Sequence, residues 1–196
     1  SKQGEGAALL AAYRQHDKAL FDKIGGRFAF ALWDHAKQFG LVATDKFAQI
    51  PIYWSTATQD RLIFAPTATS IRLLGDIDTR LDKQGIFNYL YFHMVPSPST
   101  AFQNVNKLTA GHAIAIEKGD TQIFLYWQPD FREQADASMR DASEELLGLL
   151  SSSVDRLRRG TDTGAFLSGG LDSSTVSGLL AKQQPNPNTY SIGFDA

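Results

Sequence analysis

Residues 168–174, with the sequence Ser-Gly-Gly-Leu-Asp-Ser-Ser, hold the side chains of this chain that are best suited to chemistry. The three serines offer hydroxyl groups, and the two glycines let the backbone turn sharply, take positive φ and approach a ligand closely. Asp172 adds a carboxylate, which repels a phosphate unless a cation such as Mg²⁺ lies between the two. We therefore predict a phosphate site with a magnesium ion, built from Ser168, Gly169, Gly170, Asp172, Ser173 and Ser174.

Two predicted elements must position this stretch. Residues 163–167 form a short apolar run that suits a buried strand, and residues 172–182 form a helix. The helix has three apolar side chains on one side, Val176, Leu179 and Leu180. In the order strand, glycine turn, helix, the free N–H groups at the helix start point into the turn, where an anion is favoured. A second apolar segment, residues 189–194, is expected to be a parallel neighbour strand.

The pattern of residues 168–174 differs from two other glycine-rich phosphate loops. It lacks both the Gly-Lys-Ser/Thr ending of the Walker sequence and the G-x-G-x-x-G spacing of dinucleotide-binding folds. A flexible Ser/Gly connector capped by an aspartate would explain Ser-Gly-Gly alone. The flanking strand and helix favour the phosphate site over this alternative.

The composition is that of an ordinary globular protein. The 196 residues are 43% hydrophobic and 20% charged, with a formal net charge of −2, so no basic field for nucleic acid is expected. No apolar stretch approaches the roughly 20 residues of a membrane span, and no signal-peptide pattern is present. We expect a cytoplasmic protein with neither a nucleic-acid nor a membrane partner. The chain has no cysteine, which excludes disulfides, thiolate metal sites and a cysteine nucleophile within it.

Residues 1–127 are predicted to be α+β, with a helix followed by antiparallel strands in two layers. The helix spans residues 5–16. Residues 27–34 are apolar on both alternating faces, which is typical of a central strand covered on two sides. The other predicted strands are residues 40–45, 52–55, 61–65, 105–108, 111–117 and 121–127.

Two further helices are predicted. One begins after Asp82, its N-cap, and carries the apolar side chains Ile86, Phe87 and Leu90. The other spans residues 143–159 and follows a polar segment, residues 128–140, which is the predicted interdomain linker. It ends in three arginines that suit the helix dipole, and a phosphate contact is the alternative role for Arg156, Arg158 and Arg159.

Three segments in order resemble the asparagine synthase (glutamine-hydrolysing) family along the whole chain. Residues 26–34, Gly-Arg-Phe-Ala-Phe-Ala-Leu-Trp-Asp, are similar to its G-x-FAFALWD strand. Residues 96–127 contain its P-x-x-x-T-x-F, KL-x-x-GH and YW groups. Residues 165–174 match its synthetase signature, the SGGxDS pyrophosphate-binding loop (PP-loop) of the ATP pyrophosphatases.

The resemblance implies two domains. Residues 1–127 would be a class II glutamine amidotransferase-like domain, a layered antiparallel sandwich of the N-terminal-nucleophile type without its N-terminal part. Residues 141–196 would be the α/β start of a Rossmann-like PP-loop domain, its first β-loop-α-β. Such a domain uses ATP and Mg²⁺ to adenylate a small carboxylate, here aspartate-like. Ammonia from glutamine or another source then attacks the adenylate, and AMP and pyrophosphate leave.

The family's site residues can be carried over onto this sequence. The adenine would be lined by Ile192 and Gly193, and Mg²⁺ would be bound by Asp172. A homo-oligomer is a further partner that the resemblance allows. The ATP and pyrophosphate contacts would fall on Leu167, Ser168, Gly169, Gly170, Leu171, Asp172, Ser173 and Ser174.

The chain departs from the family in its first domain. The family nucleophile is a cysteine, so no catalytic residue is predicted in this half; Ser1, the sole hydroxyl candidate by position, aligns with the interior of the family domain. The family motif ARDRFGIKPLY appears as ATDKFAQIPIY in residues 43–53, without the first arginine, the glycine and the lysine.

The interpretation we favour is a fragment of an asparagine-synthetase-like, ATP-dependent amide ligase. One alternative is a β-lactam-synthetase-like cyclase, or another amide ligase, whose glutaminase domain is not catalytic. A non-catalytic nucleotide-binding or scaffold fragment is the other.

Overall fold

A computed structural model of the chain describes residues 4–57, 61–74, 77–132, 138–158, 160 and 162–193. The chain divides into two compact units, Ser1–Asp130 and Phe131–Ala196, and each is described by itself. Within the described ranges, no helix is both long enough and apolar enough to cross a membrane.

The larger sheet of the first unit has four antiparallel strands in the order β1-β2-β6-β7. Strand β2 (Phe39–Thr44) pairs with both neighbours and is buried at all six positions, because a hydrophobic cluster covers each of its faces. The prediction of a central strand at residues 27–34 is wrong for the described part of the chain, where β1 (Ala29–Asp34) pairs with β2 alone and forms an edge. The remaining strands are β6 (His112–Glu117) and β7 (Asp120–Leu125).

The smaller sheet has the order β4-β3-β5 and is also antiparallel. Its strands β3 (Tyr53–Ser55) and β4 (Ile63–Ala65) form the hairpin that the sequence predicts. Strand β5 (Asn106–Lys107) pairs with the other side of β3. The predicted class of mixed α and β structure with antiparallel sheets is therefore confirmed.

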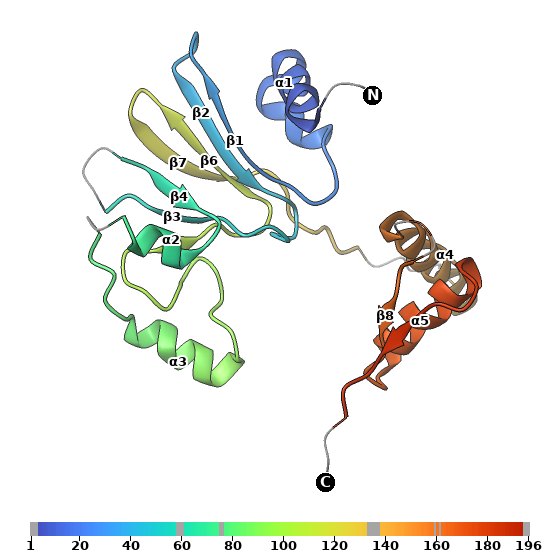
Figure 1. Cartoon of the computed structure of the whole chain (residues 1–196). Coiled ribbons are helices and arrows are strands. Elements are labelled where there is room, and N and C mark those ends of the chain that lie inside the picture. The colour runs from blue at the N-terminus through green and yellow to red at the C-terminus, as the bar shows by residue number, and fades with distance from the viewer. Residues whose placement is uncertain are drawn as a thin grey trace. The chain divides into compact units, whose positions relative to one another are not determined.

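The two sheets lie between helices (Figure 1). Helix α1 (Glu5–His16) and the 3-10 helix η1 (Asp17–Asp22) pack on one face of the larger sheet, where Tyr13 and Phe21 join a buried cluster with Leu41. The other face meets the smaller sheet through a second cluster that includes Val42 and Ile52. Helix α2 (Ala68–Arg72) covers the far side of the smaller sheet with the fully buried Ile71. The packing order is helix, sheet, sheet, helix.

Helix α3 (Lys83–Phe92) begins where the sequence predicts. The carboxylate of Asp82 accepts hydrogen bonds from the N–H groups of Gln84 and Gly85, at 3.4 and 3.1 Å. Two of the apolar side chains that this helix carries are exposed, Phe87 at 59% and Leu90 at 71%. The N-cap sets the helix start locally, whereas burial depends on which elements lie next to the helix.

The second unit begins with helix α4 (Met139–Leu157), which is capped by the Ser138 hydroxyl. The helix starts four residues before the predicted residue 143, so the last two residues of the predicted linker are helical. None of its residues is buried in the described part of the chain, and Leu157 is 78% exposed.

The rest of the second unit is β8 (Ala165–Phe166), α5 (Leu171–Gln183) and β9 (Thr189–Tyr190). The two strands are parallel, as predicted, with Phe166 opposite Tyr190. The prediction of a buried strand is wrong at Phe166, which is 78% exposed. On α5, Leu179 and Leu180 are buried as expected and Val176 is 42% exposed.

Candidate functional site

The predicted phosphate loop runs from the end of β8 to the start of α5. Leu167, which joins β8 to the loop, donates its N–H to the carbonyl oxygen of Tyr190 at 2.8 Å. The hydroxyl of Ser191 donates to the carbonyl oxygen of Leu167 at 2.7 Å. Tyr190 and Ser191 come next to Leu167 because β8 and β9 pair in parallel. The end of β8, which precedes the loop, is therefore held in place by β9 and the residue after it.

The two glycines of the loop have different roles. Gly169 has a φ of +85°, and a Cβ built on it would meet no atom within 4 Å. Gly170 is the N-cap of α5 with φ −81° and ψ 164°, an extended conformation that other residues adopt. The positive φ that the sequence predicts is therefore required only at Gly169, and the space beside Gly169 is open to a ligand.

Three hydrogen bonds close the loop on itself through Ser173. Its hydroxyl donates to the carbonyl oxygen of Gly170 at 3.1 Å and accepts the N–H of Ser168 at 3.2 Å. The hydroxyl oxygen of Ser168 lies 2.9 Å from that of Ser173. Because the single proton of Ser173 goes to Gly170, Ser168 is the donor in this contact. The hydroxyls predicted to bind phosphate are therefore hydrogen-bonded to each other in the structure.

The start of α5 offers free backbone donors. Gly170 supplies no capping side chain, and the N–H groups of Leu171, Asp172 and Ser173 have no acceptor within the described ranges. Such N–H groups carry the positive end of the helix dipole and favour an anion. Leu171 and Asp172 are exposed, so a ligand has access to this end of the helix.

Asp172 is the sole acidic side chain of the loop and lies in the first turn of α5. Among the residues that the structure describes, no group of three or more His, Cys, Asp or Glu side chains could hold a metal ion. Magnesium commonly takes one or two carboxylates and completes its shell with phosphate oxygens and water. One exposed carboxylate beside a phosphate cradle fits that form of site.

The residues predicted to line the adenine lie at the same end of the parallel strands as the loop. Ile192 and Gly193 follow β9 (Thr189–Tyr190) after Ser191 and are exposed, with Ile192 at 82%. Parallel strands bring their carboxyl ends to one edge of a sheet, where ligands of such folds bind. Phe194, the last residue of the predicted second strand, lies outside the described residues.

The arginines at the end of α4 contact protein groups. Arg158 donates from Nη1 to the carbonyl oxygen of Gln183 at 2.7 Å and from Nη2 to Asp155 at 3.1 Å. Arg156 contacts the hydroxyl of Ser153 at 3.3 Å. Arg158 therefore supports the C-terminal end of α5, a different helix from the one predicted, and Arg159 lies outside the described residues.

Two structurally important residues were not found from the sequence, Ser191 and Asp45. Asp45 is fully buried and accepts the N–H groups of Phe47 and Gln49 on Oδ1, at 3.0 and 3.2 Å. Its Oδ2 accepts those of Phe28 and Ile50, at 3.3 and 3.4 Å. The bond to residue i+2 is the Asx turn that an aspartate after a strand often forms, and this signal could have identified Asp45.

The segment that resembles the family motif has a structural role here. Thr44, in place of the family arginine, donates its hydroxyl to the carbonyl oxygen of Ile50 at 2.6 Å. Ala48, in place of the family glycine, has a φ of +49°. Ser1, the nucleophile candidate by position, lies outside the described residues.

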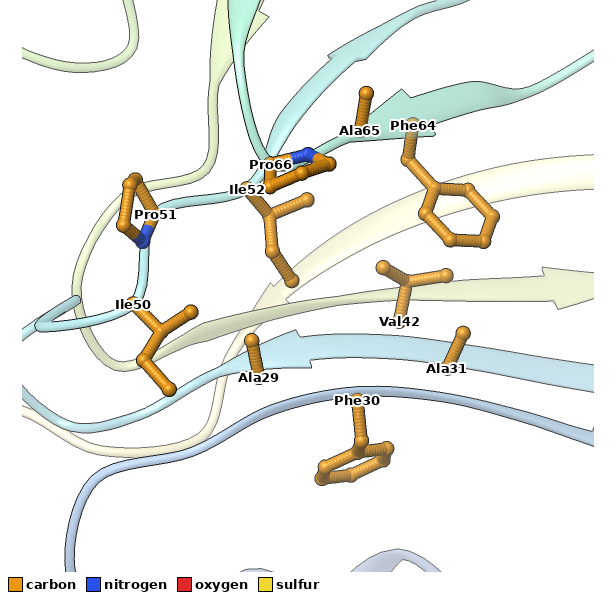
Figure 2. Close-up of a pocket in the computed structure, with 10 residues that line it drawn as sticks. All are labelled: Ala29, Phe30, Ala31, Val42, Ile50, Pro51, Ile52, Phe64, Ala65 and Pro66. Atoms are coloured by element: carbon orange, nitrogen blue, oxygen red, sulfur yellow. The ribbon is translucent and has the colours of Figure 1, made fainter.

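A hollow of about 230 Å³ lies beside this segment, between the two sheets. Its lining is entirely apolar (Figure 2), so its side chains offer no acid, base or nucleophile. The lining residues are Ala29, Phe30, Ala31, Val42, Ile50, Pro51, Ile52, Phe64, Ala65 and Pro66.

Comparison with known proteins agrees with this division of the chain. The family model for the glutamine amidotransferase domain matches residues 2–127. The chain belongs to this glutamine amidotransferase family. The family model for asparagine synthase matches residues 145–196, so the amidotransferase domain is followed by the start of an asparagine synthase domain.

The relatives of this amidotransferase-family chain include two proteins of Bacillus subtilis (strain 168). "Asparagine synthetase [glutamine-hydrolyzing] 1" is 30% identical over 188 residues, covering 95% of this chain and 29% of the relative. "Asparagine synthetase [glutamine-hydrolyzing] 3" is 28% identical over 194 residues, covering 95% and 31%. "Amidase chyE" of Penicillium rubens is 24% identical over 189 residues, covering 88% and 26%. The chain thus spans less than a third of the length of these relatives.

Proposed function

We propose that residues 168–174 bind the pyrophosphate portion of ATP, as part of an ATP-dependent, amide-forming ligase of the asparagine synthetase type. One observation carries the proposal: the N–H groups that open α5 are unpaired in the described part of the chain and adjoin Gly169, whose φ is +85°. The backbone can therefore approach an anion while several donors remain available. Membership of the amidotransferase family and the match to asparagine synthase support the assignment.

The charges of the loop favour binding with a cation. A helix start stabilises an anion by about 0.3–1 kcal/mol. The carboxylate of Asp172 opposes a phosphate in the absence of a cation. A Mg²⁺ ion held by Asp172 would supply the positive charge that offsets this repulsion. We propose Asp172 as its protein ligand, and the affinity for pyrophosphate should fall strongly when Mg²⁺ is chelated.

In the proposed reaction a carboxylate oxygen attacks the α-phosphorus of ATP, and pyrophosphate leaves. Ammonia then attacks the acyl carbon of the adenylate, and AMP leaves with the former carboxylate oxygen. The loop amides would hold the leaving pyrophosphate, whose negative charge increases in the transition state. Ile192 and Gly193 would orient the adenosine, with ATP, ammonia and an aspartate-like carboxylate as the small-molecule partners.

For the first unit we propose the layered N-terminal-nucleophile type of sandwich. Its support is the packing order of helix, sheet, sheet and helix. We propose residues 128–138 as the linker that follows it, because residues 139 and 140 of the predicted linker belong to α4. These 196 residues contain no cysteine, and acyl transfer from glutamine needs an activated nucleophile. We therefore expect this chain to release no more glutamate from glutamine than a control without protein. Glutamate release that is lost in the Ser1→Ala variant would contradict this expectation.

The assay for the ligase is AMP formation from ATP. Aspartate with ammonia should give AMP in a Mg²⁺-dependent manner if the asparagine synthetase type is right. Because one relative is named an amidase, other carboxylates should be screened in parallel. AMP with another carboxylate alone would favour the cyclase-like alternative, and pyrophosphate binding without AMP would favour a nucleotide-binding scaffold.

A further inference from the structure

One peptide group at the start of the phosphate loop is held at both ends by serine hydroxyls. This is the peptide that joins Leu167 to Ser168. Its carbonyl oxygen accepts the Ser191 hydroxyl at 2.7 Å, and its N–H donates to the Ser173 hydroxyl at 3.2 Å. Ser191 follows β9 and Ser173 lies in the first turn of α5, so two different elements fix the plane of this peptide.

The Ser191 hydroxyl binds a carbonyl oxygen that the backbone of β9 does not reach. The backbone ladder between β8 and β9 includes bonds from Ala165 to Asn188, at 3.0 Å, and from Leu167 to Tyr190, at 2.8 Å. A regular parallel ladder would continue from the N–H of Ile192 to the carbonyl of Leu167, but no such backbone bond is present. The hydroxyl of Ser191 takes its place, and the backbone after Ser191 is released from the sheet.

We propose that Ser191 is a positioning residue for the phosphate loop. Its hydroxyl fixes the direction of the Leu167–Ser168 peptide, and because a peptide is planar this also fixes the position of the Ser168 Cα, from which the chain continues to Gly169. A loop that is fixed before the ligand arrives loses less freedom on binding, and its affinity is correspondingly higher. The proposal rests on the proposed function, since it concerns the same loop and its pyrophosphate ligand.

The test compares Ser191→Ala with Ser191→Thr, which keeps the hydroxyl. Thr189→Ala is the matched control, because Thr189 lies two residues earlier on β9 and its hydroxyl makes no hydrogen bond within the described ranges. The first measurement, made without ligand, is the hydrogen-exchange rate of the Ser168 amide by NMR. The second is the dissociation constant of magnesium pyrophosphate by titration calorimetry.

Ser191→Ala should raise the exchange rate of the Ser168 amide about fivefold and weaken pyrophosphate binding about fivefold, the worth of one net hydrogen bond. Ser191→Thr should restore both values, and Thr189→Ala should change neither. An unchanged exchange rate in Ser191→Ala would overturn the proposal, and so would faster exchange with unchanged affinity. If the wild type binds no pyrophosphate, the proposed function fails. The hydrogen-exchange rates of the Ser168 amide in the wild type and in Ser191→Ala then show by themselves whether Ser191 holds the Leu167–Ser168 peptide.

Discussion

The hydroxyl oxygens of Ser168 and Ser173 lie 2.9 Å apart across the phosphate loop. Ser173 also accepts the N–H of Ser168 and donates its proton to the carbonyl oxygen of Gly170. The loop is thus closed by its own side chains, and the N–H groups at the start of α5 are left as the donors for an anion. A phosphate that recruits either hydroxyl must replace one of these internal bonds.

Ser173→Ala should loosen the loop in the absence of ligand. The change removes three contacts of the Ser173 hydroxyl, so the Ser168 amide should exchange at least fivefold faster in NMR experiments, the equivalent of about 1 kcal/mol. Ser174→Ala is the matched control, because the Ser174 hydroxyl has no hydrogen bond in the described part of the chain. Equal exchange rates in the two variants would show that Ser173 does not close the loop.

Ala48→Gly should stabilise the first unit. Ala48 has a φ of +49°, a left-handed conformation that costs an alanine about 1 kcal/mol and a glycine very little. Allowing for the greater freedom of glycine in the unfolded chain, we expect a gain of about 0.5 kcal/mol in the free energy of unfolding. Urea unfolding followed by tryptophan fluorescence measures this unit specifically, because all three tryptophans (Trp33, Trp54 and Trp127) lie within it.

A matched alanine in a turn provides the control for Ala48→Gly. Ala36 is exposed and is not among the residues with positive φ. Ala36→Gly should therefore lower the free energy of unfolding by a few tenths of a kcal/mol or more. If both glycine variants are destabilised to the same extent, the strain assigned to Ala48 is absent.

Tyr126 should make the stability of the first unit depend on pH in the alkaline range. Burial, and after it the charge of Asp45, raise the pKa of Tyr126 from its ordinary value of 10.0 to about 12. As the pH rises above the unfolded value, the unfolded chain loses its proton first, so stability is lost between pH 10 and pH 12. Below pH 10 the contribution is fully present.

Tyr126→Phe isolates this contribution. The variant lacks the hydrogen bond from the Tyr126 hydroxyl to the Thr44 carbonyl oxygen, which is 2.6 Å long. At pH 8 it should therefore be less stable than the wild type by about 0.5–1.5 kcal/mol. In urea unfolding this difference should shrink as the pH rises toward 12. A difference that stays constant over the range would refute the assigned pKa.

Local signals in the sequence were sufficient for most element starts. Helix α1 begins and ends at the predicted residues, because its apolar residues recur at helical spacing. Asp82 identified the start of α3 through the chemistry of the N-cap. The parallel pairing of β8 with β9 followed from the order strand, loop, helix, strand.

Burial and strand position were harder to predict, because they depend on distant residues. Periodicity shows which side of an element is apolar, but it does not show what covers that side. Phe166 was therefore expected in a buried strand, although it is 78% exposed. Residues 27–34 were likewise predicted as a central strand from two apolar faces, whereas β1 pairs with β2 alone in the described part of the chain.

The residues of the candidate site are a prediction from the sequence, and their hydrogen bonds became known only from the structure. The sequence indicated Ser168 and Ser173 as donors to phosphate, whereas in the structure their hydroxyls are hydrogen-bonded to each other. Ser191 was not found because its partner, Leu167, lies 24 residues away and the contact exists only once β8 and β9 pair. Such a long-range bond leaves no periodic signal in a single sequence.

A substitution at Gly169 gives the most direct test of whether residues 168–174 bind pyrophosphate with Mg²⁺. The φ of +85° at Gly169 and the open space beside it mean that Gly169→Val strains the backbone and places a side chain where the ligand would lie. Gly119→Val is the matched control, because Gly119 has a φ of +90°, has no atom within 4 Å of a built Cβ, and lies in the first unit.

Titration calorimetry of this chain with pyrophosphate, with and without Mg²⁺, tests the claim most directly. The wild type and Gly119→Val should bind with Mg²⁺ and bind much more weakly after chelation, whereas Gly169→Val should lose at least tenfold in affinity under either condition. Asp172→Ala should reduce the dependence on Mg²⁺. Equal binding of magnesium pyrophosphate by the wild type and Gly169→Val, or no binding by the wild type, would contradict the assignment of the phosphate site to this loop.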